Sequence, residues 1–479
     1  GSNNVEFLCR PLNKALATDT NILDMTDNFS ADKQWFRSKD GKKLLAGSPL
    51  TLFTVSTAGS AILDAIESDT PLPPQHQQLT DRLSVTGAIH PQNVASCSAE
   101  QVTVVIPAFI SDEEDQVALQ SLVDELRPLR IVIVDDASPF FFEIVKTTIV
   151  RLEENSGPAT ARNTGLKHVE SPFVVFVDTD VQISALDVLN LAGHLTDTQL
   201  LAVAPRVETE RTKSFITEYE SFHSPLDLGP DPAVVRPLSR VAYVPSAVLA
   251  CNASHLRELD GFNEELRVGE DVDLIWRGVE GKFDVRYAPE IVATHSPRHT
   301  VRSMLKQRIS YGSSSAALDE RHPRFSAPLR THLFFFVPVM LLFLGYLVTA
   351  AIALIPMFFY FALTLRNTGM SLPQRTRITW WGLASTTKLT ASAIRRVWWP
   401  LFAVASLVTT RPVITWSFCV LIPTLFGLMK KKPRQPLTYL VVRSLDDMSY
   451  GIGVWRGAIQ RKSLRCLLPV FTVRASSRR

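Results

Sequence analysis

The sequence contains little cysteine, and beyond Glu320 it contains almost no acidic residues. Five cysteines are spread over 479 residues. An odd, scattered set of this kind forms neither the framework of a disulfide-rich domain nor a zinc ribbon, so we expect a reducing compartment. The first residues lack a charged flank followed by an apolar stretch, and we therefore expect no secretory signal.

Because acidic residues are scarce near the end of the chain, its two parts carry net charges of opposite sign. Residues 321–479 contain only Asp446 and Asp447 as acids, against 22 of the 50 Lys and Arg, and carry a net charge of +20. Residues 1–320 carry −17. A basic, apolar segment favours a membrane surface with anionic lipid as a partner. We expect no nucleic-acid partner, because the basic residues alternate with Trp and Leu and form no recognisable nucleic-acid module.

The first predicted part, residues 1–97, has the size of a small winged-helix module. A strand is expected over residues 42–46 and helices over 57–67 and 79–87, each bounded by turn-forming residues. The segments LLAGSPLTLFTVSTAGSAILDAI and LTDRLSVTGAIHP resemble the PqqD-like peptide-recognition modules of systems that mature ribosomal peptides. A generic regulatory or packing domain is the alternative.

The second predicted part, residues 98–320, shows the alternation of strands and helices found in α/β domains. Apolar strands are expected over residues 102–107, 131–134 and 173–177, and an amphipathic helix over 112–126. Polar residues follow each strand. Because ligands bind outside the carboxyl ends of such strands, the sequence predicts a nucleotide cleft at this edge of the sheet.

Asp178 and Asp180 end the apolar run that begins at Val174. Carboxylates two residues apart at a strand end can hold one hard divalent cation between the protein and the phosphates of a ligand. The pair therefore suggests metal-dependent nucleotide chemistry, with the start of a solvated loop as the alternative.

A series of motifs follows in an order typical of one kind of enzyme. They are VTVVIPAF, IVIVDDAS, NSGPATARNTGL, VVFVDTDV and GFNEELRVGEDVDLIWR. Over residues 100–312 this set resembles the family-2 inverting glycosyltransferases. The resemblance implies a GT-A fold with a Rossmann-like mixed sheet, a UDP-sugar donor, and Mg²⁺ or Mn²⁺ as cofactor.

The resemblance also assigns roles to individual residues. Asp136 would contact the uridine, and Arg162 would neutralise the diphosphate or hold the base-binding loop. Asp178 and Asp180 would anchor the metal ion, with Asp180 as the direct ligand. His295 is a candidate for a further metal ligand, with a structural histidine as the alternative. The other residues predicted in the donor site are Pro107, Ala108, Asp135, Asn163, Arg308 and Tyr311.

Glu270 and Asp271 follow Gly269 and match the Glu-Asp motif of that family. An inverting transfer needs a base that takes a hydroxyl proton from the acceptor, and Asp271 is predicted to be this base. A helix N-cap is its alternative role. In KQRISYGSS, Arg308 and Tyr311 are predicted to close over the diphosphate. Because processive relatives use Trp at the position of Tyr311, processivity stays open.

The segment RSLDDMSYGIGVWRGAIQRKS, together with the PqqD-like start and the catalytic motifs, resembles the mycofactocin glycosyltransferases of actinobacteria. This narrower resemblance implies β-linked transfer of glucose to a peptide-derived acceptor, the mycofactocin redox cofactor or its precursor. A protein of the maturation pathway is the partner expected at the first module. Two alternatives are a transferase for a cell-envelope lipid or polysaccharide and a non-enzymatic, nucleotide-sugar-binding membrane scaffold.

The last predicted part is helical and membrane-associated, at the cytoplasmic face of the cell membrane. Residues 333–363 carry no charge and are long enough to span a bilayer. Pro338 and Pro356 leave open one long span, a broken span or a shallow hairpin. Residues 397–429 are interrupted by Arg411, which is costly in hydrocarbon, so a re-entrant pair or an interfacial position is expected. A buried helical subdomain is the alternative.

Overall fold

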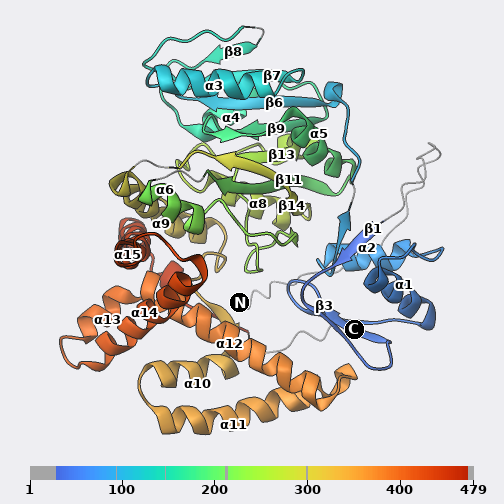
Figure 1. Ribbon diagram of the computed structural model, residues 1–479, viewed down its shortest axis with the longest axis vertical. Helices are drawn as coiled ribbons and strands as arrows, with labels where there is room; N and C mark the ends of the chain where they lie inside the picture. Colours follow the sequence, from blue (N-terminus) through green and yellow to red (C-terminus); the bar gives the residue numbers. More distant parts are fainter. Residues whose placement is uncertain (1–27, 93, 146, 211–213, 298–299, 473–479) are drawn as a thin grey trace.

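The computed structural model describes residues 28–92, 94–145, 147–210, 214–297 and 300–472. Cys9 and the rest of the first 27 residues lie outside this part of the chain. The described residues form a central sheet with helices on both faces and a small N-terminal module beside it. A helical region lies at the opposite end of the molecule from β8 (Figure 1). The cysteines within the described residues are free thiols.

The central sheet has nine strands in the order β10-β14-β11-β13-β9-β6-β7-β8, with β12 paired to β14. Strands β9, β6, β7 and β8 are parallel, whereas β13 runs antiparallel to both β9 and β11. This GT-A-like mixed sheet confirms the predicted fold class. The strands are β6 (Val102–Ala108), β7 (Arg130–Asp135), β8 (Thr148–Arg151), β9 (Phe173–Val177), β10 (Val181–Gln182), β11 (Leu200–Thr209), β12 (Ala233–Val234), β13 (Val248–Asn252) and β14 (Asp284–His295).

Helices cover both faces of this sheet and bury two apolar cores. Leu122 of α3 and Leu191 of α5 belong to the core on one face, whereas Ala161 of α4, Leu256 of α7 and Ile275 of α8 belong to the core on the other. The helices of this part are α3 (Glu113–Glu125), α4 (Pro158–Leu166), α5 (Ala185–Gly193), α6 (Phe215–His223), α7 (Ala253–Glu258), α8 (Glu270–Glu280) and α9 (Val301–Arg321), with short 3-10 turns η1 (Ala99–Gln101) and η2 (His194–Thr196).

The N-terminal module contains an antiparallel sheet, β2-β3-β4, and a separate ribbon in which β1 pairs with β5. Its core is closed by Leu44, Phe53, Leu63 and Leu83. The strand and helices predicted from the sequence are present, whereas the PqqD-like character and the domain boundaries stay predictions. The elements are β1 (Asn28–Ala31), β2 (Trp35–Arg37), β3 (Lys43–Ala46), β4 (Thr51–Thr54), α1 (Thr57–Ser68), α2 (Gln77–Val85) and β5 (Ile89–Gln92).

The C-terminal region is helical, as predicted. Residues 333–363 do not form one long helix, because the chain turns at Gly345, whose φ is +84°. Phe334 stacks on Tyr360 with ring centroids 4.4 Å apart, so α10 and α11 form an antiparallel hairpin. The elements are β15 (Arg330–His332), α10 (Leu333–Phe343), α11 (Leu347–Thr364), η3 (Leu365–Thr368), α12 (Leu372–Arg396), α13 (Trp399–Ala405), α14 (Arg411–Lys431), α15 (Pro436–Gln460), η4 (Arg465–Leu467) and β16 (Val470–Thr472).

Helix α15 joins this region to the part that contains the central sheet by packing closely on α9. A Cβ on Gly453 would lie 2.1 Å from the carbonyl oxygen of Ile309, and a Cβ on Gly312 would lie 2.2 Å from that of Tyr450. Only glycine allows the two backbones to approach in this way. In the C-terminal sequence motif, Gly453 and Gly457 therefore serve the packing of α15 on α9, whereas Gly451 faces the carbonyl oxygen of Arg396 on α12.

Candidate active site

Arg162 on α4 joins two groups that the sequence predicts for the site. Its Nη2 donates to Oδ1 of Asp178 at 2.7 Å, and its Nη1 donates to Oε1 of Glu270 at 2.9 Å. Burial alone lowers the pKa of Arg162, but the charges of these carboxylates outweigh it and hold the pKa above its ordinary value. Arg162 is therefore a permanent cation between the end of β9 and the start of α8.

Asp180 lies beside His295, although the two are 115 residues apart in the chain. The antiparallel pairing of β10 with the end of β14 sets Val181 opposite His295, which brings the ring Nε2 to 3.1 Å from Oδ2 of Asp180. The other ring nitrogen, Nδ1, is buried without a hydrogen-bond partner. The structure thus brings together the two side chains predicted to meet at the metal.

The groups at this strand end suit a divalent cation. Desolvation and the neighbouring charge of Asp180 raise the pKa of Asp178 despite the opposing charge of Arg162. A divalent ion would relieve this repulsion between carboxylates. Among the described residues, no group of three or more His, Cys, Asp or Glu forms a metal cluster. An ion here would take Asp180 and His295 from the protein and further oxygen ligands from a diphosphate.

Asp271 lies in the first turn of α8, next to Glu270. Its Oδ1 accepts from the backbone N–H of Val272 at 2.7 Å, and its Oδ2 accepts from that of Ser246 at 3.4 Å. Desolvation raises the pKa of Asp271. The pKa of Glu270 is also raised, by desolvation and by the neighbouring charge of Asp271. The N-cap position itself is occupied by Gly269, with a φ of +86°, but Asp271 still accepts a free N–H of the first turn, so its structural alternative stays open beside the predicted role as base.

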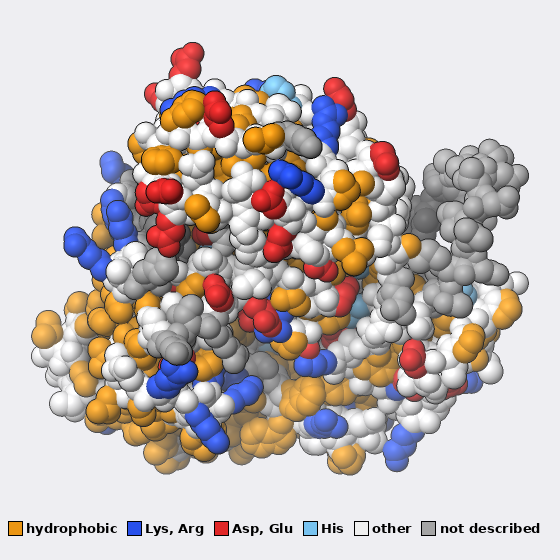
Figure 2. Space-filling view, turned by 45° about the horizontal axis from the view of Figure 1, so that its top comes forward, with side chains coloured by type: hydrophobic (Ala, Val, Ile, Leu, Met, Phe, Trp, Pro, Cys, Tyr) orange, Lys and Arg blue, Asp and Glu red, His pale blue; other side chains and the backbone are white. Residues whose placement is uncertain are grey.

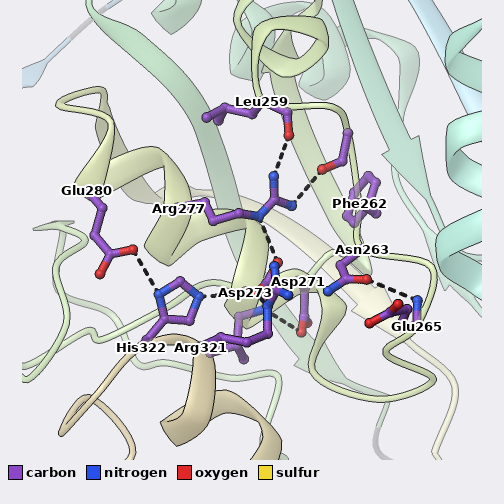
Figure 3. Close-up of polar contacts among 12 residues, drawn as sticks. Leu259, Phe262, Asn263, Glu265, Asp271, Asp273, Arg277, Glu280, Arg321 and His322 are labelled. Atoms are coloured by element: carbon purple, nitrogen blue, oxygen red, sulfur yellow. Dashed lines mark hydrogen bonds and ion pairs between the residues drawn. The ribbon is translucent and has the colours of Figure 1, made fainter.

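A buried ionic network fixes the orientation of α8 (Figure 3). The fully buried carboxylate of Asp273 accepts from Nε of Arg277 at 2.7 Å and from Nε of Arg321 at 2.5 Å, and Nε2 of His322 lies 3.1 Å away. The other ring nitrogen of His322 lies 2.9 Å from Glu280. Because Asp273 is two residues after Asp271, the network holds the helix that carries the predicted base.

Asp273→Ala should destabilise the protein by about 3 kcal/mol, because it leaves two guanidinium groups and an imidazole without their shared partner. Urea unfolding followed by circular dichroism measures the loss. Glu280→Ala is the matched control, since the side chain of Glu280 is 45% exposed and its pair with His322 should contribute less than about 1 kcal/mol. Equal effects of the two substitutions would contradict the central role of Asp273.

Several residues predicted for the donor site hold the loops around it. Both carboxylate oxygens of Asp136 accept backbone N–H groups, from Ser156 at 2.7 Å and Gly157 at 2.9 Å. Asp135 pairs with Arg151, which sequence reasoning missed and which no sequence signal marks. The strand that contains Pro107 ends at Ala108, whose carbonyl oxygen accepts from the N–H of Asp136 at 2.8 Å; these three residues line the same strand ends.

Asn163 fastens α4 to the loop before α8. Its Nδ2 donates to the carbonyl oxygen of Phe262 at 2.8 Å, and its Oδ1 accepts from the N–H of the same residue at 2.8 Å. A Cβ on Gly261 would lie 2.4 Å from that Oδ1. Asn163 thus positions the segment that leads to Glu270, and its predicted contact with the donor stays a prediction.

Arg308 and Tyr311 lie on α9, and Arg308 pairs with carboxylates of two neighbouring helices. Arg308 is buried, with Nε 2.9 Å from Oδ1 of Asp446 on α15 and Nη2 3.7 Å from Oε1 of Glu220 on α6. The hydroxyl of Tyr311 accepts from Gln307 at 2.9 Å. The structure therefore does not bring Arg308 into contact with Arg162, Asp178 or Glu270, and its predicted role at the diphosphate stays untested.

The chain belongs to glycosyl transferase family 2. Residues 103–241 match the model of "Glycosyl transferase family 2", and residues 173–430 match that of "Glycosyl transferase family group 2". The chain is also similar to the "Pre-mycofactocin glycosyltransferase" of two Mycobacterium tuberculosis strains, CDC 1551 / Oshkosh and H37Rv. Each is 32% identical over 453 residues, which cover 90% of this chain and 94% of the relative. The protein is accordingly a glycosyltransferase.

Solved structures give weaker similarities. A mannosyltransferase from Pyrobaculum calidifontis, in complex with GDP-Man and Mn²⁺, is 16% identical with a TM-score of 0.37, over 75% of this chain and 90% of that chain. TarS residues 1–349 from S. aureus, in complex with UDP, are 18% identical with a TM-score of 0.34, over 47% of this chain and 71% of that chain.

Proposed function

We propose that the protein transfers a hexose, β-linked glucose, from a UDP-sugar with inversion to a peptide-derived acceptor, the mycofactocin redox cofactor or its precursor. The relatives named "Pre-mycofactocin glycosyltransferase" support this acceptor. The observation that carries the proposal is the double contact of Arg162, which joins Asp178 to Glu270. Arg162 thus links Asp178, proposed for the donor side of the site, to Glu270, which belongs to the Glu270–Asp271 pair proposed for the acceptor side.

In the proposed reaction, an acceptor hydroxyl loses its proton to Asp271 as its oxygen bonds to the anomeric carbon, and the bond from that carbon to the diphosphate breaks. The N–H groups of Ser246 and Val272 orient the carboxylate of Asp271. Arg162 lowers the pKa of Glu270, although desolvation and the charge of Asp271 outweigh it and raise that pKa to about 7, and Arg162 also offers a positive charge near the departing diphosphate. A metal ion held by Asp180 and His295 would stabilise the negative charge of that leaving group.

The test is a transfer assay with the purified protein, Mg²⁺ or Mn²⁺, and UDP-glucose, UDP-galactose or GDP-mannose. Products from peptide-derived acceptors and from lipid acceptors are weighed by mass spectrometry. We expect hexose addition to the peptide-derived acceptor with UDP-glucose. Transfer to a lipid alone would replace this proposal with the cell-envelope alternative, and donor binding without transfer would favour the scaffold alternative.

We further propose that the N-terminal module acts on the acceptor side and receives a protein of the maturation pathway. Two of its contacts fall on the segment between β12 and β13. Asp32 pairs with Arg240 at 3.1 Å, and the carbonyl oxygen of Val85 accepts from Arg236 at 2.6 Å. Near the end of the same segment, the backbone N–H of Ser246 donates to Asp271. The module thus supports the segment that orients the proposed base.

Arg240→Ala should raise the KM for the acceptor by about fivefold or more while the affinity for UDP stays unchanged, because the segment beside the base loses its attachment. Steady-state kinetics and calorimetric titration with UDP measure the two quantities. Lys33→Ala is the matched control, since Lys33 also belongs to the N-terminal module but pairs with Asp231, which lies just before β12, and is 69% exposed. An unchanged acceptor KM in Arg240→Ala would separate the module from acceptor use.

We also propose the cytoplasmic face of the cell membrane as the location of the enzyme. Two described helices are long and apolar enough to cross a membrane, residues 347–368 and 411–431. The positive charge of residues 321–479 supports attraction to anionic lipid.

A further inference from the structure

Helices α11 and α14 each present an apolar stripe to the outside along their whole length. On α11 the stripe consists of Val348, Ile352, Ile355, Phe359 and Leu363, all more than half exposed. The opposite side of α11 packs inside the protein through Met357 and Phe361. The stripe on α14 consists of Ile414, Phe418, Ile422, Leu425 and Met429. Hydrophobic side chains accordingly gather along the lower edge of the molecule (Figure 2).

An exposed apolar surface of this extent marks an interaction site. Its chemistry matches a lipid surface, because basic side chains border it and acidic ones are absent from residues 321–445. Arg377 and Lys388 are exposed on α12, which packs on α11 and α14, and the exposed Lys430 and Lys432 lie at the end of α14. The exposed Trp380 and Trp381 lie on the same helix, α12, as two of these cations. Trp beside Lys and Arg is typical of the headgroup level of a bilayer.

Both long apolar helices are paired with short ones. Helix α11 forms a hairpin with α10, which has 11 residues and is therefore about 16 Å long. Helix α14 packs against α13, which has 7 residues and is about 10 Å long. The hydrocarbon core of a bilayer is about 30 Å thick. A hairpin crosses only if both of its arms do, so neither pair has the length to reach the far side.

The ends of both hairpins away from their turns are attached to the rest of the protein. Beyond α11, the carbonyl oxygen of Asn367 accepts from Lys43 of the N-terminal module at 2.6 Å. Lys431 at the end of α14 donates to the carbonyl oxygen of Phe222 on α6. Trp398, just before α13, donates to Leu467 of η4 at 2.8 Å. Each hairpin therefore leaves and rejoins the protein on one side.

The turns of the two hairpins meet. The guanidinium of Arg411, at the start of α14, lies 5.7 Å from the ring centroid of Tyr346, in the turn between α10 and α11. Leu407 and Val408, in the turn before α14, are 85% and 90% exposed. A crossing orientation would carry Arg411 through hydrocarbon, whereas an orientation along the surface lets it reach the headgroups.

We propose that the α10–α11 and α13–α14 hairpins lie in one leaflet of an anionic bilayer, with their long axes along the membrane plane, and that the chain does not cross the membrane. The stripes of α11 and α14 face the acyl chains, and the Lys and Arg side chains around them face the headgroups. This inference concerns attachment alone and is independent of the proposed sugar transfer.

The first experiment measures binding to vesicles of phosphatidylcholine and phosphatidylglycerol at 3:1, by co-sedimentation at 0.1 M and 1 M NaCl. We expect wild-type protein to stay bound at high salt. The double variant Ile355→Glu with Phe359→Glu should bind at least about tenfold more weakly. Val117→Glu is the matched control, because Val117 is also apolar and is 62% exposed but lies on α3 of the catalytic part. It should bind like the wild type.

The second experiment tests for crossing. The Val408→Cys variant is added to preformed vesicles, so that it binds from outside. A membrane-impermeant maleimide is either added to the outer solution or trapped inside the vesicles. We expect protection from both reagents and labelling once detergent is added. Val117→Cys, as control, should react with the outer reagent throughout. Labelling of Val408→Cys by the trapped reagent would show crossing and overturn the proposal.

A third outcome would assign the apolar surface to another occupant. If the wild type fails to bind vesicles and is a dimer in detergent-free buffer, and if Ile355→Glu with Phe359→Glu is a monomer, the stripes are covered by a second copy of the chain. That result would also overturn the membrane proposal, whatever the transfer assay gives.

Discussion

Asp271→Asn should lower kcat by about 10²-fold or more, while the affinity for UDP stays within a few-fold. Asparagine keeps the shape of the side chain and one oxygen, which can still accept from Val272 or Ser246, but its amide cannot take a proton. The loss should therefore fall on the chemical step and spare donor binding. Stopped-flow or discontinuous assays give kcat, and calorimetric titration gives the affinity for UDP.

The pH dependence of the reaction provides an independent test of Asp271. A base works only when deprotonated, and desolvation raises the pKa of Asp271 above its usual range. The rate of the wild type should accordingly fall as the pH falls through this raised pKa and be constant above it. The acidic limb should be absent from Asp271→Asn. Wild-type turnover in the variant would leave Asp271 as an acid in the first turn of α8, without a part in the chemistry.

Asp180→Ala should abolish transfer and remove the dependence of donor binding on a divalent ion. The side chain of Asp180 is 43% exposed, so its loss should cost little folding stability. Without it, His295 alone faces the charge of the diphosphate from that side of the site. Titration with UDP in Mn²⁺ and in a chelator measures the expected change, which is a difference for the wild type and none for the variant.

Asp197→Ala controls for the loss of an acidic residue. Asp197 pairs with Arg286 at the other end of β14 from His295, at 3.1 Å. This variant should keep the effect of Mn²⁺ on UDP binding. Full activity of Asp180→Ala in saturating Mg²⁺ would remove the metal site from the proposal.

The parts of the fold predicted from the sequence are those that local patterns determine. The apolar runs that became β6, β7 and β9 end in proline or aspartate, and such boundaries are set within a few residues. Gly269 before Glu270 marked the start of α8 for the same reason. These positions were enough to predict the acidic side chains on one edge of the sheet.

The contacts that the sequence did not reveal join residues far apart in the chain. Arg162 and Glu270 are separated by 108 residues, and Arg308 and Asp446 by 138. The sequence around an arginine is the same whether the side chain binds a ligand or a buried carboxylate. The pairing of Arg308 with a carboxylate on another helix was therefore not predictable. The hairpin of α10 and α11 was one of three options, because proline tolerates either a kink or a break in an apolar helix.

The glycine contacts of α9 have a mechanical consequence. The side chain of Ser314 on α9 lies 3.2 Å from the Cβ that Gly269 would carry, and two residues earlier on α9 Gly312 packs against the backbone of α15. Between α9 and α15 the contact is backbone on backbone, which leaves no side chain to change rotamer, so these two helices should move as one rigid unit with the start of α8 resting on side chains of α9. If the enzyme is bound through α11 and α14, its reaction centre would stay at a constant distance from the lipid surface. An acceptor must then come to that distance, in solution or on a tether of matching length.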